Sequence, residues 1–341
     1  MQLEVIQTLE EFDRLADEWN GLLDCSASHV PFLRHEYLAA WWRTLGGGEW
    51  AHGDLYVVAA RRGDGSLGAV APLFFTENRE GEPAIMLLGS IEISDYLDVL
   101  ICPDDTPAFV EALFDHLQTQ QAPTWQVLDF YNILEGSPTL EVLQSAAGRR
   151  GWRYTQERLQ HCPYIPLPGD WETYLAGIDK KQRHEIRRKI RRAESYEVPV
   201  RWYIAQDGAR LDEQIESFFY LMEQDPDKKA FLTEAMRSQM RSAIQAAFKG
   251  GWLQLAFLDV GEEKAAAYLS FDYGDHIWVY NSGLDFKHGA VSPGWVLLGY
   301  LLQWANENKR RGFDFMRGDE EYKYRFGAID RFIVRASIRR A

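Results

Sequence analysis

The chain has 341 residues, 46% of them hydrophobic, and a formal net charge of −14. This length and apolar content are enough for the cores of two ordinary domains. The acidic balance argues against binding of duplex nucleic acid, because neutralising phosphates requires clustered lysine and arginine. The first residues lack the basic and apolar segments of a secretory signal, and residues 295–305, the most apolar expected helix, are too few to span a bilayer.

The cysteines and histidines give no sign of a metal site. Cys25, Cys102 and Cys162 are far apart in the sequence and lack metal-ligand spacing. An odd number of separated cysteines is typical of a reducing compartment, so we expect a cytoplasmic protein without disulfides. The histidines are scattered, and neither an HExxH motif nor a Walker phosphate loop occurs. We expect a site without metal.

The first half alternates strand and helix patterns. We expect strands at 3–6, 55–60, 69–75, 85–88, 96–101, 125–131 and 152–159, with helices at 9–23, 31–45, 109–120 and 140–149. The second helix is rich in aromatic residues, which favour core packing over a ligand platform. Residues 94–98 combine serine and aspartate with apolar residues, and they either line a groove or cap a strand.

A proline-rich stretch, residues 161–171, is expected to link two domains, 1–160 and 161–341. The helix expected over 171–195 follows it and carries a run of cations: Lys180, Lys181, Arg183, Arg187, Arg188, Lys189, Arg191 and Arg192. Such a run attracts a nucleotide, a lipid-linked diphosphate, a tRNA or an anionic membrane surface. The alternative is a solvated helical face that serves solubility.

The second half repeats the α/β pattern of the first. A strand at 198–204 and helices at 211–223 and 231–248 precede a meander of strands at 252–259, 265–273 and 277–284, with turns at Gly261 and Gly274. A closing strand is expected at 332–338. The fold class is therefore α/β (α+β), with a mixed, mostly antiparallel sheet flanked by helices in each half.

One stretch, residues 278–327, combines a strand, a loop, an amphipathic helix and a second strand. In the loop, Ser292 can cap the helix, Pro293 fits the first turn and Gly294 allows close approach to the backbone. Free N–H groups and the helix dipole would attract an anion there, although an ordinary capped crossover has the same sequence pattern.

Charged residues and tyrosines crowd the segment after that helix. The segment contains Asp314, Arg317, Asp319, Glu320, Glu321, Tyr322, Lys323 and Arg325. They follow the apolar alternation of Phe313 and Phe315, at the end of a strand where open sheets place ligand crevices. The alternative is a solvated exit loop with surface ion pairs.

The order of NSGLD, SPG and GFDFMRGDEEYKYRFGA resembles the CelD-like acyltransferase family of the GNAT superfamily and, more distantly, the FemABX peptidyltransferases. The resemblance covers roughly residues 162–328. It implies tandem GNAT-like halves and an N-acyltransferase in polysaccharide or cell-envelope biosynthesis, with acyl-CoA as donor, or aminoacyl-tRNA in the Fem branch. It also implies that Lys323 is the family's catalytically important lysine. The sequence departs from the family in lacking the usual GNAT pyrophosphate signature, which residues 287–290 match only loosely.

Acyl transfer to an amine requires a base, a stabilised oxyanion and a proton for the leaving group. We expect Asp319 to act as base, Lys323 to hold the developing charge, and Tyr322 or Tyr280 to protonate the leaving group. The donor's phosphates are expected to bind to Lys287, Gly289, Ser292, Pro293 and Gly294. The donor or the acceptor is expected to contact Asn281, Gly283, Asp314 and Arg317. The competing hypothesis is a non-catalytic tandem module that binds a polysaccharide or a protein. The sequence leaves the acyl group, the acceptor and the oligomeric state open.

Overall fold

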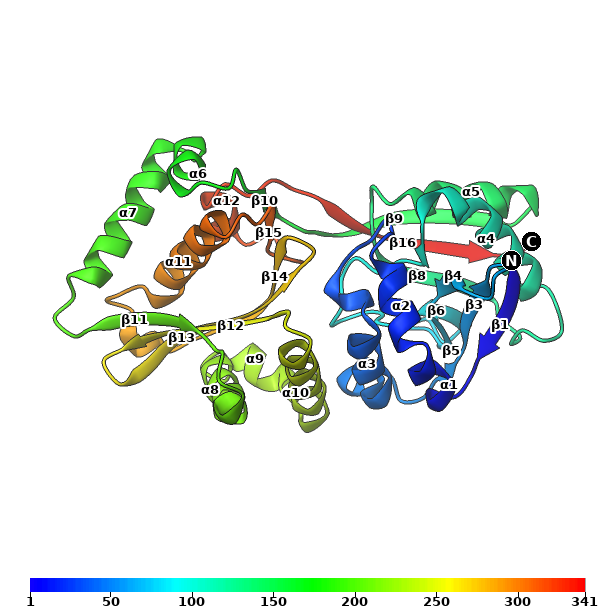
Figure 1. Ribbon diagram of the computed structural model, residues 1–341, viewed down its shortest axis with the longest axis horizontal. Helices are drawn as coiled ribbons and strands as arrows, with labels where there is room; N and C mark the ends of the chain where they lie inside the picture. Colours follow the sequence, from blue (N-terminus) through cyan, green and yellow to red (C-terminus); the bar gives the residue numbers. More distant parts are fainter. Residues whose placement is uncertain (341) are drawn as a thin grey trace. The chain divides into compact units, whose positions relative to one another are not determined.

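The computed structural model describes residues 1–340 (Figure 1). The chain forms two compact units, one made of Met1–Gln160 with the segment that starts at Phe332, and the other of His161–Arg331. Both units contain sheets with helices packed against them, and most strand pairs are antiparallel. The predicted fold class is therefore confirmed.

The first unit has two sheets. One has the order β1 (Gln2–Ile6), β3 (Val57–Arg61), β4 (Leu67–Ala71) and β7 (Leu100–Ile101). The other has the order β2 (Asp54–Leu55), β5 (Leu73–Glu77), β6 (Pro83–Leu87), β8 (Val127–Leu134), β16 (Phe332–Arg339) and β9 (Arg153–His161). The helices are α1 (Leu9–Arg14), α2 (Ala16–Leu23), η1 (Pro31–Leu33), α3 (His35–Gly48), η2 (Pro103–Asp105), α4 (Thr106–Leu117) and α5 (Pro138–Arg149).

The aromatic residues of α3 lie in the core, as predicted. Tyr37 and Trp41 are fully buried, and the Trp41 ring lies 5.3 Å from that of Phe74. Residues 94–98 also have a structural role. The buried Asp98 accepts hydrogen bonds from the hydroxyls of Ser28 (2.8 Å) and Ser137 (2.6 Å), and burial raises the pKa of its carboxyl group.

The last strand corrects the predicted domain boundary. The sequence suggested that residues 332–338 close the second half, but β16 pairs antiparallel with β8 in the first unit. Its apolar residues enter that core, and Arg335 forms an ion pair with the buried Asp129 (Nε to Oδ1, 2.6 Å). An alternating strand pattern fixes which face is buried but not which sheet receives the strand.

The expectation that no disulfide forms is wrong. Cys25, just after α2, and Cys102, just after β7, form a disulfide across a sequence separation of 77 residues. Their spacing along the sequence gave no sign of the contact, because it arises from α2 packing against β7. Cys162 is the buried free cysteine. The cysteine pattern therefore gives no support to the predicted reducing compartment.

The second unit has one sheet, in the order β10 (Tyr164–Pro166), β15 (Gly312–Asp314), β14 (His276–Leu284), β13 (Glu263–Tyr273), β12 (Leu253–Val260) and β11 (Val200–Ile204). Its helices are α6 (Trp171–Gly177), α7 (Lys180–Glu194), η3 (Gly208–Arg210), α8 (Leu211–Met222), α9 (Pro226–Phe231), α10 (Glu234–Lys249), η4 (Phe286–His288), α11 (Pro293–Glu307) and α12 (Glu321–Arg325). Figure 1 shows α7 and α11 on one face of the sheet and α8 and α10 on the other.

The predicted meander of β12, β13 and β14 is confirmed, with the turn glycines Gly261 and Gly274 at φ 63° and 60°. Two details differ from the prediction. Part of the expected linker is strand β10, which pairs with β15. The single helix expected over 171–195 is broken into α6 and α7, because the Asp179 carboxylate caps a new helix start by accepting from Lys181 N (2.9 Å).

The divergence of β14 and β15 positions the site. The two strands pair in parallel only where His276–Trp278 meets Gly312–Asp314, whereas β14 continues to Leu284. The register of β14 against β13 shifts at Tyr280, which is a bulge. Beyond Trp278 the edge of β14 therefore faces an opening instead of a neighbouring strand.

Candidate active site

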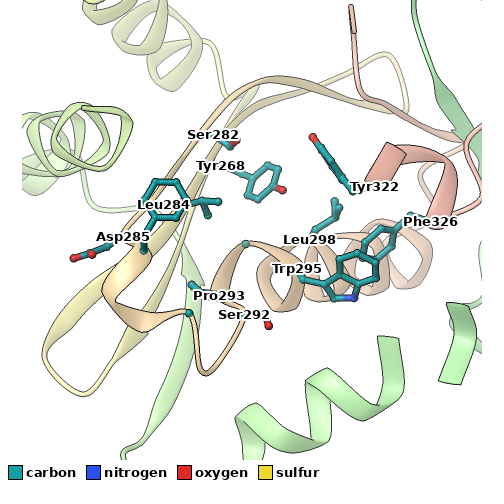
Figure 2. A pocket seen from close by; sticks show the side chains of 13 residues that line it. Tyr268, Ser282, Leu284, Asp285, Ser292, Pro293, Trp295, Leu298, Tyr322 and Phe326 are labelled. Carbon is teal, nitrogen blue, oxygen red and sulfur yellow. The ribbon is translucent and has the colours of Figure 1, made fainter. Parts of the chain in front are cut away.

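The opening leads to a pocket of about 300 Å³ between β13, β14, the loop before α11, and α12. Figure 2 shows the side chains around it. The lining residues are Tyr268, Ser282, Leu284, Asp285, Phe286, Gly289, Ser292, Pro293, Gly294, Trp295, Leu298, Tyr322 and Phe326. The structure thus brings together four of the predicted phosphate-binding residues and Tyr322.

The start of α11 presents free donors to this pocket. Ser292 lies in the left-handed region (φ 56°), and its side chain does not cap the helix, in contrast to the prediction. Pro293 occupies the first turn, as predicted, and Val296 N donates to Ser292 O (3.0 Å). Within residues 1–340, the amides of Gly294 and Trp295 have no acceptor. Two unsatisfied N–H groups at the positive end of a helix dipole have the chemistry to bind an anion.

Two tyrosine hydroxyls lie at the other end of the pocket, near Ser282 (Figure 2). Neither Tyr268 nor Tyr322 forms a hydroxyl hydrogen bond with any part of the chain that the structure describes. Burial raises the pKa of both phenols, and the nearby negative charge of Glu320 raises them further. Both groups are therefore protonated donors at neutral pH.

The walls between the two ends are mostly apolar. The rings of Trp295 and Phe326 lie 4.6 Å apart, and Leu284 and Leu298 complete the lining. Gly294 packs closely against Leu284, and an added Cβ would lie 2.6 Å from the leucine Cδ2, so the leucine side chain would have to shift. Lys189 of α7 lies behind Trp295, with Nζ 4.2 Å from the ring centroid. An apolar channel between an anion site and hydroxyl donors suits an extended molecule with one charged end.

Lys323 does not point into the pocket. Its side chain is 3% exposed, and Nζ donates to the carbonyls of Arg317 (2.8 Å) and Gly318 (2.9 Å) and to Oε2 of Glu320 (2.8 Å), with Phe315 O at 3.3 Å. An ammonium has three hydrogens, so these acceptors use all of them. Lys323 therefore holds the loop before α12, and it is not among the residues that line the pocket.

The acidic residues next to Lys323 differ in position. Asp319 is exposed and forms no hydrogen bond or ion pair within the described residues. Glu320 is held by Lys323, and its charge acts on Tyr268, Tyr322 and Lys228. Glu320 is also exposed, and neither carboxylate lines the pocket, but the charge of Glu320 is the one that reaches the two pocket tyrosines.

The predicted acceptor-binding residues lie outside the pocket. Asp314 is buried, accepts from Met316 N (2.8 Å) and forms an ion pair with Arg331, while Arg317 follows it in the loop that Lys323 holds. Gly283 is a packing residue, because an added Cβ would lie 2.6 Å from the backbone of α8 at Leu221. None of these three residues lines the pocket.

The other predicted residues also serve local structure. Tyr280 packs its ring 5.7 Å from Phe271, and Asn281 accepts from Ser282 N through its side chain (2.8 Å). The exposed Lys287 pairs with Glu263 and Asp285 (both 3.2 Å). It borders a neighbouring groove instead of the pocket. Of the residues in the loose match to the pyrophosphate signature, Gly289 lines the pocket and Lys287 does not.

Five residues at or next to the pocket were not predicted from the sequence: Tyr268, Ser282, Trp295, Phe326 and the half-buried Lys228. Tyr268 and Ser282 are opposite each other in the register of β13 and β14, so a strand-pairing analysis could have found them together. The sequence pattern around Trp295 and Phe326 is that of aromatic residues in a hydrophobic core. No pattern marked Lys228, because it reaches Ser282 from α9 through a contact that only the fold creates.

Residues 180–324 match the family described as an acetyltransferase (GNAT) domain. The second unit therefore contains a GNAT-type domain, as the resemblance implied, and the chemistry it supports is acyl transfer. The whole chain shares its fold with FemX, with a TM-score of 0.68 at 11% identity, covering 98% of this chain and 97% of that one.

Two other solved structures share the fold. L-PGS from Bacillus licheniformis matches with a TM-score of 0.57 at 14% identity, covering 95% of this chain and 91% of that one. A conserved protein of unknown function from Bacteroides thetaiotaomicron matches with a TM-score of 0.62 at 13% identity, covering 99% of this chain and all of that one. No curated protein matches the chain in sequence.

No group of three or more histidine, cysteine, aspartate or glutamate side chains within residues 1–340 is arranged to hold a metal ion. No helix in the same range combines the length and hydropathy needed to cross a bilayer.

Proposed function

We propose that this protein transfers an acyl group from acyl-CoA to an amine, for example that of an amino sugar. The observation that carries this proposal is that the free amides of Gly294 and Trp295 and the free hydroxyls of Tyr268 and Tyr322 border one pocket. The GNAT-type domain supports acyl transfer in general. The geometry of the pocket is our reason for proposing acyl-CoA as the donor.

The donor would lie along the apolar channel. Its diphosphate would accept hydrogen bonds from the start of α11, where the helix dipole favours negative charge. Its pantetheine arm would pack against Trp295 and Leu298 and bring the thioester to Ser282 and the tyrosines. An aminoacyl-tRNA would require a much larger contact surface than the pocket itself offers.

The chemistry uses a base and an acid at the tyrosine end. Glu320, whose charge reaches both tyrosines, would take a proton from the attacking ammonium or amine, directly or through water. This role replaces the one expected for Asp319. Tyr322 would donate its proton to the departing thiolate, since its hydroxyl is unpaired and fully protonated at neutral pH. Lys323 would act by holding Glu320 in place.

A second part of the proposal concerns helix α7. Of its eight lysines and arginines, Arg187, Arg188 and Lys189 pair with carboxylates, whereas Lys180, Lys181 and Arg192 form no ion pair within residues 1–340. This surplus charge lies on the helix that packs against α11. We propose that it attracts an anionic acceptor, such as a charged saccharide of the cell envelope, or the phosphates of the donor.

Isothermal titration calorimetry with acetyl-CoA and longer acyl-CoAs tests the donor. We expect binding with a Kd in the micromolar range and a loss of turnover of about 100-fold in Tyr322→Phe, because general acids contribute factors of this size. Tyr324→Phe is the matched control, since Tyr324 lies on the same helix but donates to Asp330 (2.7 Å). Absence of binding to every acyl-CoA would contradict the proposal and favour a tRNA-dependent enzyme or a non-catalytic module.

A further inference from the structure

Lys228 places a cation next to Ser282, a lining residue of the pocket, without lining the pocket itself. Its Nζ donates to the carbonyl oxygen of Ser282 and lies 3.4 Å from the Ser282 hydroxyl oxygen. Ser282 lines the pocket, next to Tyr268 in Figure 2. The hydroxyl of Ser282 is thus in contact with both the pocket and the ammonium group.

The backbone of Ser282 shows where this ammonium group lies. In an antiparallel strand, the N–H and C=O of one residue point to the same side. Ser282 N donates to the Asn281 side chain (2.8 Å), and Ser282 O accepts from Lys228, so neither group bonds to β13. Both therefore face the edge where β14 has left β15. The ammonium group of Lys228 therefore lies at this edge of β14, beside Ser282.

The charge of Lys228 is available for a ligand. Within residues 1–340 Lys228 forms no ion pair, although Asp225 and Glu320 are near enough to raise its pKa. Burial is the larger effect and lowers the pKa of the amine. A half-buried cation without a contact ion pair stabilises a nearby negative charge more strongly than an exposed one. Lys323, which the sequence suggested for this role, has no hydrogen left to donate.

We infer that Ser282 and Lys228 hold the negative charge that develops on the carbonyl oxygen of the donor's acyl group. The inference rests on the proposed function. As the amine nitrogen bonds to the carbonyl carbon, the π electrons move onto the oxygen, which accepts the Ser282 hydroxyl hydrogen bond. They return when the carbon–sulfur bond breaks, and the thiolate takes the proton of Tyr322. Ser282 is a catalytic residue in this step, and Lys228 is a positioning residue that polarises its hydroxyl.

The test uses the full chain with acetyl-CoA as probe and release of free CoA thiol as readout, with a panel of amines as acceptors. Ser282→Ala and Lys228→Met are expected to lower kcat about 100-fold while the calorimetric Kd for acetyl-CoA changes less than about threefold, because oxyanion contacts act mainly in the transition state. Lys228→Arg is expected to recover part of kcat. Lys229→Met is the matched control, since Lys229 is the exposed neighbour on α9.

The outcomes separate this inference from the proposed function. Suppose that wild type turns over acetyl-CoA and that both Lys228→Met and Ser282→Ala turn it over as fast as wild type does. The inference is then overturned, and the proposed function stands. An acetyl adduct on Ser282 in the intact mass would also overturn it, because the hydroxyl would then be a nucleophile. If wild type neither binds nor cleaves any acyl-CoA, the proposed function fails and this role fails with it. Ser282→Ala removes only one oxygen, so it carries the test if Lys228→Met does not fold.

Discussion

The Nζ atom of Lys189 lies 4.2 Å from the centre of the Trp295 ring, so a cation of the basic helix α7 touches a wall of the candidate pocket. Burial lowers the pKa of this amine, which is only 19% exposed as a side chain. Through this contact the basic helix α7 packs against the start of α11, the second segment for which the sequence suggested an anion. The positive charge of Lys189 therefore lies next to Trp295, whose backbone amide is one of the two proposed anion donors.

Lys189→Met is therefore expected to weaken acetyl-CoA binding about 3- to 10-fold, the range of a partly desolvated cation–π and charge contribution. The difference between the variant and wild type should shrink as salt is raised from about 0.05 to 0.5 M, because screening suppresses the charge contribution. Calorimetry at both salt concentrations measures it. Lys249→Met, an exposed change on α10, serves as control, and equal affinities of wild type and Lys189→Met would refute the contact.

Lys323→Met tests the structural role of the buried lysine. The change leaves the carbonyls of Arg317 and Gly318 without their donor, so a loss of about 2–4 kcal/mol in the free energy of unfolding is expected. Urea denaturation followed by tryptophan fluorescence measures it. A variant as stable as wild type but without turnover would instead support the catalytic role that the family resemblance implied.

The stability of the first unit should fall in mild acid. His35 is 4% exposed, its Nε2 lies 3.0 Å from Phe12 O, and burial lowers its pKa below the usual 6.5, although the charges of Asp13 and Glu36 oppose this. The unfolded chain therefore binds the proton first as pH falls through about 6.5, and stability is lost from there downward. Thermal melts between pH 7.5 and 5 should show this slope, and His35→Gln should reduce it. An identical slope in the variant would contradict the assignment.

The disulfide gives a separate stability prediction. Replacing Cys25 and Cys102 together by serine should lower the free energy of unfolding by roughly 2–4 kcal/mol, because the bond closes a long loop in the unfolded chain. A reducing agent should lower the Tm of wild type by a similar amount and leave the double variant unchanged. Mass spectrometry of the non-reduced protein checks the bond directly, and two free thiols there would refute it.

Local patterns predicted the elements, and tertiary pairing decided where they go. The turn residues Gly261 and Gly274 fixed the meander, since each must adopt a positive φ. The alternation in β16 was recognised correctly but assigned to the other half, because its partner β8 lies about 200 residues earlier in the chain.

The site was predicted in part for a similar reason. The loop around Pro293 and Gly294 is local in sequence, and the structure places it in the pocket with Tyr322. Lys323 is a residue type often found in active sites, and the sequence placed it there. In the structure its ammonium group donates instead to the carbonyls of Arg317 and Gly318 and to the Glu320 carboxylate. Lys228 and Ser282 are 54 residues apart in the sequence. Hydrophobic periodicity predicts local elements only, so it could not predict this contact.

The most direct test of the account is hydrogen–deuterium exchange of the segment Ser292–Val296 with and without acetyl-CoA. If the amides of Gly294 and Trp295 bind the donor's diphosphate, saturating acetyl-CoA should slow their exchange about 10-fold or more. Exchange in α10, on the other face of the sheet, should stay unchanged. Saturation with acetyl-CoA that leaves the Ser292–Val296 segment exchanging at its free rate would contradict the central claim.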